Sequence, residues 1–161
     1  MNEEYKIITH DILNNEYYQR LKNEVHHHNS NRYNHCVEVS MKTYKICKRL
    51  NIDYISATRA ALLHDFFFNG EFSNKKEQML NHPKKAAENA KKITKLNKKE
   101  LNVIESHMYP VGKTLPKHKE SIIVDLVDDY IAIKEKIGGD LEYCKTALTF
   151  LLIIGIEFII K

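Results

Sequence analysis

Residues that favour turns are scarce in this sequence, and that scarcity limits the folds open to it. Among 161 residues there are five glycines and three prolines. No stretch alternates apolar and polar residues between Gly-containing turns, as the strands of a half-buried sheet would. Apolar residues instead recur every three or four positions, the period of a helix with one buried face. We therefore expect an all-α bundle forming a single domain over residues 1–161, a length that suits one core.

The apolar spacing predicts six to seven helices. Residues 67–81 are expected to form a loop, after which Pro83 suits the first turn of the next helix. Asn97 and Glu100 have the spacing of a capping pair at the start of another helix. The expected helices cover approximately residues 11–25, 32–50, 55–66, 83–96, 97–109, 120–137 and 141–160.

The distribution of charged residues limits the kinds of binding partner that we expect. The formal net charge of +4 comes from dispersed lysines, many of them in KK pairs. No aromatic residues interleave with the basic ones, so the pattern is typical of solvated helix faces, and we expect no sequence-specific binding of nucleic acid. A modest positive charge does favour anionic small molecules.

Cysteine usage indicates a reducing compartment. There are three cysteines and no CxxC motif. Cys36 and Cys47 fall on one expected helix, about 16 Å apart at about 1.5 Å per residue, whereas a disulfide needs Cα atoms within about 7 Å. Residues 1–25 are polar and include acidic groups, unlike a signal peptide. We predict a cytoplasmic protein.

The C-terminal run at residues 147–160, ALTFLLIIGIEFII, is apolar except for Glu157. A spanning helix needs about 20 such residues, so no membrane span is predicted. We expect this segment to pack in the core or in a homodimer interface, and weak contact with a membrane surface is the alternative.

The stretch ALLHDF (residues 61–66) ends an apolar run in His64 and Asp65. A buried carboxylate is tolerated when it is paired, hydrogen-bonded or bound to a metal. Residues of the same two types recur on or beside other expected helices, and a helical bundle can aim such side chains at one central site. Taken singly, each could equally be a hydrogen-bonded core residue. The set comprises His35, His64, Asp65, His82, His107 and Asp128.

Five sequence blocks, taken in order, resemble the HD-domain superfamily of metal-dependent phosphohydrolases. They are NRYNHCVEVS, AALLHDFF, NHPKKAAENAKKI, IESHMYP and ESIIVDLVDDYIA, and they cover roughly residues 28–136. The His-Asp dipeptide alone is a weak signal, but the five blocks together are specific.

The resemblance implies two metals, since the minimal pattern of the family lacks the two middle histidines. The first metal would be bound by His35, His64, Asp65 and Asp128. Asp65 would also bridge to a second metal bound by His82 and His107 and position the attacking hydroxide. The expected cofactors are divalent transition metals, with Fe or Mn favoured and Zn, Co, Ni or Mg as alternatives.

The last aspartate of the pattern has alternatives. Leu126-Val127-Asp128-Asp129 fits the family's final block best. Asp125 lies one helical turn earlier, so it could support the ligand or replace it.

Three further residues are candidate substrate contacts. Arg32 could clamp a phosphate bidentately, His28 resembles a pocket position of related bacterial HD proteins, and Lys113 follows the His107 block. His26 and His27 are expected to form a surface tract or to bind metal only incidentally. The implied reaction is hydrolysis of a phosphomonoester or phosphodiester, with a nucleotide as the expected substrate. A regulatory module that binds metal and nucleotide without turnover is the alternative.

Overall fold

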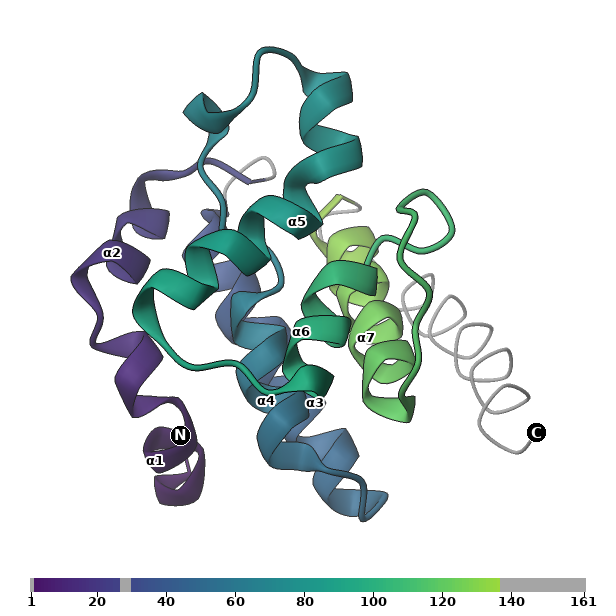
Figure 1. The fold of residues 1–161 in the computed structure, drawn as a ribbon. Coiled ribbons are helices and arrows are strands. Elements are labelled where there is room, and N and C mark those ends of the chain that lie inside the picture. Colours follow the sequence, from purple (N-terminus) through teal and green to yellow (C-terminus); the bar gives the residue numbers. More distant parts are fainter. Residues whose placement is uncertain (1, 27–29, 137–161) are drawn as a thin grey trace.

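The computed structural model describes residues 2–26 and 30–136, whose regular secondary structure is helical (Figure 1). Within these ranges the only β pairing is an isolated bridge between Val25 and Asn31. The all-α prediction is therefore confirmed. The elements are α1 (Glu3–Leu13), α2 (Glu16–Gln19), η1 (Arg20–Asn23), α3 (Arg32–Arg49), α4 (Tyr54–Leu63), η2 (Asn69–Glu71), α5 (Lys75–Ile93), α6 (Lys98–Ser106) and α7 (Lys119–Lys136).

Helix α4 is the centre of the bundle and contacts α1, α3, α5, α6 and α7. Ala57, Ala60 and Ala61 are fully buried, as are Leu62 and Leu63. The small alanine side chains let neighbouring helices approach closely, while the two leucines fill the core. Because α4 ends at Leu63, the two residues that follow it, His64 and Asp65, lie in the interior of the protein.

The single helix predicted for residues 11–25 is wrong. Helix α1 already begins at Glu3, and the chain breaks at Asn14 and Asn15 before α2. The Asn15 Oδ1 atom accepts hydrogen bonds from the backbone N–H groups of Tyr17 and Tyr18, at 3.0 and 3.3 Å. Asparagine favours such caps over helix interiors, and this preference overrides the continuous apolar stripe.

The loop predicted for residues 67–81 is also too long, because α5 begins at Lys75. Asn74 caps the helix by accepting from Glu77 N at 2.9 Å, and the Glu77 carboxylate accepts from Ser73 N at 2.9 Å. Pro83 therefore lies inside α5 rather than in its first turn. These two capping hydrogen bonds specify the earlier start.

Other boundaries follow the sequence. The predicted pair at the start of α6 is a capping box, in which Asn97 accepts from Glu100 N at 2.8 Å and Glu100 accepts from Asn97 N at 2.7 Å. Helices α3 and α7 match their predicted ranges within one residue at each end. The expected helix at 141–160 lies outside the described residues. Among the helices that are described, none is long and apolar enough to cross a membrane.

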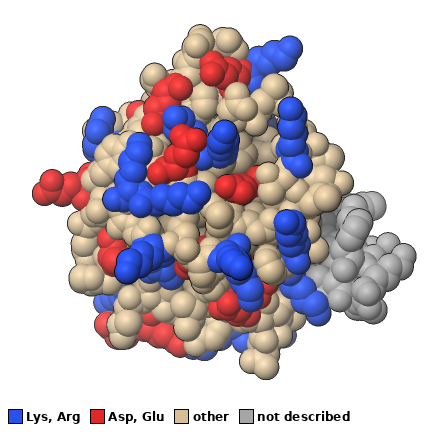
Figure 2. Space-filling view, in the orientation of Figure 1, with Lys and Arg blue, Asp and Glu red and all other residues tan. Residues whose placement is uncertain are grey.

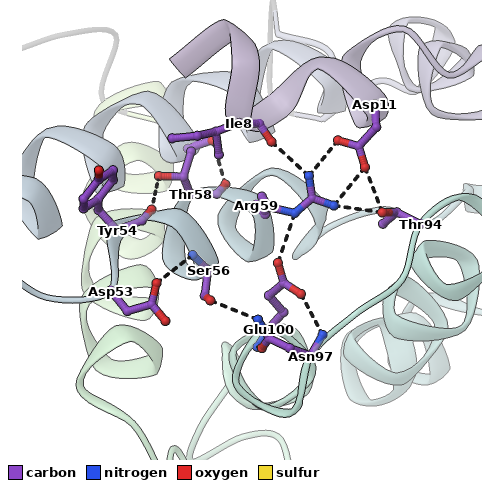
Figure 3. A network of polar contacts seen from close by, with 11 residues as sticks. Ile8, Asp11, Asp53, Tyr54, Ser56, Thr58, Arg59, Thr94, Asn97 and Glu100 are labelled. Atoms are coloured by element: carbon purple, nitrogen blue, oxygen red, sulfur yellow. Dashed lines mark hydrogen bonds and ion pairs between the residues drawn. The ribbon is translucent and has the colours of Figure 1, made fainter. Parts of the chain in front are cut away.

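A polar network around Arg59 joins α4 to its neighbours (Figure 3). The guanidinium donates to Ile8 O at 2.9 Å, to both Asp11 carboxylate oxygens at 2.6 and 2.9 Å, to Thr94 Oγ1 at 2.8 Å and to Glu100 Oε1 at 3.1 Å. All five N–H donors of the arginine are thus used. This network ties α1, α4 and α6 together at the middle of α4.

The surface charge is mixed on the face drawn in Figure 2, where basic and acidic side chains alternate. Among the ion pairs of the surface, Lys99 contacts Glu120 at 2.9 Å and Asp53 at 3.0 Å. The dispersed lysines of the sequence are therefore partly neutralised by acidic neighbours.

Candidate metal centre

The structure brings all six predicted ligands into one interior region from five separate parts of the chain, since His64 and Asp65 are adjacent. His35 comes from α3, His82 from α5 and Asp128 from α7, while His64 and His107 are the C-caps of α4 and α6. Their ligand atoms form two groups, each with atoms within 4.8 Å of one another. The groups are His35–His64–Asp128 and Asp65–His82–His107. The rings of His64 and His107, whose centroids are 5.0 Å apart, connect them.

In the first group, two imidazoles converge on one carboxylate oxygen. Asp128 Oδ1 lies 2.8 Å from His35 Nε2 and 3.4 Å from His64 Nε2. Burial alone would raise the pKa of the Asp128 carboxyl, but the His64 and His35 rings outweigh burial and hold that pKa well below its usual range. Asp128 is therefore an ionised carboxylate at neutral pH.

The second group has the same arrangement, in which two imidazoles lie close to one carboxylate oxygen. Asp65 Oδ1 lies 3.3 Å from His82 Nε2 and 3.5 Å from His107 Nε2. Burial opposes ionisation of Asp65, yet the charge of His64 and contacts with the other two rings lower its pKa well below the ordinary value. The Phe67 ring packs on His82 with centroids 5.0 Å apart, so this phenylalanine forms part of the wall.

Three of the rings are oriented by backbone carbonyls. The Nδ1 atoms lie 2.7 Å from Ala61 O in His64, 3.0 Å from Gln78 O in His82 and 2.8 Å from Ile104 O in His107. A carbonyl accepts only from N–H, so each Nδ1 is protonated and each Nε2 is aimed at the centre. This is the arrangement in which histidine binds metals, with the remote nitrogen anchored by a hydrogen bond.

The Nε2 atoms of His82 and His107 are only 2.9 Å apart. Without a cation, one of them must carry a second proton to make that contact a hydrogen bond. Burial lowers the pKa of His82, whereas contacts with Asp65 overcome burial and raise the pKa of His107. A cation bound by both Nε2 lone pairs would remove the need for that proton.

Two buried atoms test whether these residues fit a metal. His64 Nε2 and Asp65 Oδ1 have no hydrogen-bond partner among the described residues. Such atoms are costly to bury unless something else satisfies them. Four imidazoles and two carboxylates form a donor set suited to Fe, Mn or Zn. The residues present therefore fit divalent cations.

Asp125, the alternative to Asp128, belongs to neither ligand group. It is half-buried, and burial together with the charges of Asp129 and Asp128 raises its pKa to about 8, although His107 acts in the opposite direction. Asp128 is thus the α7 carboxylate that lies in a candidate ligand group, whereas Asp125 lies in none of them.

The guanidinium of Arg32 is engaged within the fold. It donates to Phe67 O and Asn69 Oδ1 at 2.9 Å each, contacts Glu24 at 3.4 Å, and lies 3.8 Å from the Phe67 ring centroid. Arg32 thus links the start of α3 to the chain just after Asp65. Its contact with a phosphate stays a prediction.

Lys113 lines a cavity of about 400 Å³ together with Lys84, Glu105 and Asn81. Two of these residues lie within two positions of His82 in the sequence, and Glu105 lies two positions before His107. The cavity that Lys113 lines therefore includes residues that are close in sequence to His82 and His107 of the second ligand group. His28 lies outside the described residues.

Sequence reasoning missed two residues of the site. Glu135 Oε2 lies 3.3 Å from His35 Nδ1, and the spacing could have revealed it, since Glu135 follows Asp128 by two helical turns on the same face. The expectation that His26 is a surface residue is wrong. Its ring stacks on His35 with centroids 4.1 Å apart, and it forms a third candidate ligand group with His35 and Asp65.

Comparison with protein families now gives the class of protein. The model of the HD domain matches residues 32–133, which is more than half of the chain, and all six predicted ligands lie within the match. This chain belongs to the HD domain family, whose members are mostly metal-dependent hydrolases. Comparisons with curated proteins and with solved structures found no match.

Proposed function

We propose that this protein is a metal-dependent phosphohydrolase that cleaves a phosphomonoester or phosphodiester, with a nucleotide as substrate. The observation that carries the proposal is the pair of ligand groups, His35–His64–Asp128 and Asp65–His82–His107, whose Nε2 and carboxylate atoms converge in the interior. Their order along the chain is that of the HD-domain pattern.

Asp65 is the residue we assign to both metals. Its carboxylate contacts His82 and His107, and it also forms a candidate ligand group with His35 from the other side. A carboxylate has two oxygens, so one aspartate can contact both ligand groups. This double membership supports a two-metal site over a single metal.

When bound, two divalent cations would neutralise the phosphate ester and lower the pKa of a water molecule. The protein's own part is to keep the site ionised and ordered. Asp65 and Asp128 both have lowered pKa values, so they supply two negative charges without taking up protons. The backbone carbonyls fix three imidazoles before any ligand arrives, which avoids reorganisation during the reaction.

The expected substrate is an anionic small molecule. Lys84 and Lys113 line one cavity. Other residues that line it, such as Asn81 and Glu105, are close in sequence to His82 or His107. Two ammonium groups there would favour a substrate with more than one phosphate or carboxylate oxygen.

The thiols of Cys36 and Cys47 are free and buried, which is in keeping with the proposed cytoplasmic location.

Phosphate release is the direct test. Protein stripped with a chelator and reloaded anaerobically with Mn²⁺ or Fe²⁺ should release phosphate from one or more members of a panel of nucleotides and diesters. His64→Ala should abolish release and lower metal content. Metal and nucleotide binding without turnover of any substrate would instead support the regulatory module.

A further inference from the structure

Four histidines of the metal centre have anchored Nδ1 atoms, but one differs from the rest. His64, His82 and His107 each contact a backbone carbonyl three or four residues earlier in their own segment. In His35 the Nδ1 atom contacts a side chain instead, the Glu135 carboxylate, at 3.3 Å. The orientation of His35 therefore depends on a second helix, α7.

The His35 ring is held between two carboxylates of that helix. Asp128 faces its Nε2 at 2.8 Å and Glu135 faces its Nδ1 at 3.3 Å. The side chain of Glu135 is only 13% exposed, so its negative charge is largely withdrawn from water. A buried carboxylate is retained at low cost only when it is paired, and His35 supplies the partner.

The same carboxylate oxygen also lies 3.7 Å from His26 Nε2, and the His26 ring stacks on His35. Glu135 thus contacts both stacked imidazoles from one side. Both Glu135 and His26 lie outside the region that matches the HD domain, residues 32–133. The family pattern therefore assigns neither residue.

We infer that Glu135 is a positioning residue for the first metal: it accepts the Nδ1 proton of His35 and so presents the Nε2 lone pair to the cation. The inference rests on the proposed metal-dependent function. A ligand histidine without such an acceptor can rotate or switch tautomer, and loss of groups of this kind typically weakens metal binding about 10–100-fold.

A matched control is available one residue away. Lys134 pairs with Glu38 at 2.7 Å and joins the same two helices, α7 and α3, without contacting a histidine. Like Glu135→Ala, the Glu38→Gln variant removes an ion pair between α3 and α7. Unlike Glu135→Ala, it leaves the contacts of His35 unchanged. Glu135→Gln keeps a hydrogen-bond acceptor and loses only the charge, so it separates the effect of the hydrogen bond from that of the charge.

The experiment measures Mn²⁺ binding to chelator-treated protein by calorimetry, in the wild type and the three variants. We expect Glu135→Ala to weaken the first Mn²⁺ site about 10–100-fold, and Glu135→Gln to recover most of that loss. Glu38→Gln should match the wild type. Circular dichroism should show equal helix content in all four proteins.

Nitrogen NMR of the His35 ring in the metal-free proteins gives a second measurement that a purely structural role would not change. Nδ1 should be protonated in the wild type, Glu38→Gln and Glu135→Gln, and should lose this proton in Glu135→Ala. An unchanged Nδ1 signal, with Mn²⁺ affinity within about threefold of the control, would overturn the inference while leaving the metal site intact. A wild type that binds no Mn²⁺ would refute the proposed function instead. The NMR result would then show only whether Glu135 orients the His35 ring.

Discussion

Two buried polar clusters involve the same helix, α4, one around Arg59 in its middle and one around His64 and Asp65 just after its last residue, and they differ in how their charges are satisfied. Around Arg59 every guanidinium donor meets an oxygen of the protein, from Ile8, Asp11, Thr94 or Glu100 (Figure 3). Around His64 and Asp65, ring nitrogens and carboxylate oxygens face one another, and one atom of each residue has no hydrogen-bond partner among the described residues.

The contrast separates a structural network from a binding site. A cluster whose donors and acceptors match internally contributes to stability and has nothing left to offer a ligand. A cluster of converging acceptors needs a cation to complete it.

Removal of Asp65 should have the greatest effect on function. Asp65→Ala should abolish tight metal binding at both positions, because the residue belongs to ligand groups on both sides. His82→Ala and His107→Ala should each lower metal content towards one per chain. Elemental analysis of anaerobically purified protein measures this, with exposed His10→Ala as the control imidazole. A wild type that never exceeds one metal, and is matched by His82→Ala and His107→Ala, would indicate a mononuclear site.

Loss of Arg59 should affect stability instead of chemistry. Arg59→Met leaves Glu100, which is nearly fully buried, without its cation. We expect the free energy of unfolding to fall by about 3 kcal/mol, the lower end for an uncompensated buried charge, because Asp11 can still reach water. Urea denaturation measures the loss. Metal bound per folded chain should stay at the wild-type value, and a parallel loss of metal would merge the two clusters into one functional unit.

The two aspartates of α7 should differ in degree. Asp128→Ala should lose metal and activity together, whereas Asp125→Ala should retain part of both, with a decrease of about 10–100-fold at most. Metal titration and phosphate release on the same samples provide the comparison. The reverse ranking would move the ligand to Asp125.

The smallest effect concerns pH. In metal-free protein the pKa of Asp125 is raised by burial to about 8, above the value near 3.8 of an unfolded chain. The folded state therefore retains a proton that the unfolded state releases, so this group stabilises the fold below about pH 4 and its contribution is lost as the pH rises to about 8.

Asp125→Asn keeps the neutral form at every pH. Its stability relative to the wild type should increase between pH 4 and pH 8 by at least about 1 kcal/mol, the equivalent of a one-unit shift. Denaturation curves across this range measure the difference. Two proteins with parallel pH profiles would show that Asp125 is hydrated in the folded state.

Local sequence signals predicted several elements correctly. The Asn97–Glu100 cap and the helices α3 and α7 follow from spacing and propensity, which act within one or two turns. The break at Asn14–Asn15 and the early start of α5 were missed, although both depend on asparagine caps that the sequence contains. In both regions an asparagine cap, and not apolar periodicity, sets where the helix begins.

The six candidate ligands could be named from the sequence because their order along the chain carries the HD-domain pattern, and the structure brings all of them together. Contacts between distant segments could not be predicted in the same way. The engagement of Arg32 with Phe67 and Asn69, the stacking of His26 on His35 and the contact of Glu135 with His35 join residues up to 100 positions apart. Residue types and their spacing specify which groups can bind a metal, whereas the packing of α3 against α7 determines which nitrogen of His35 faces it.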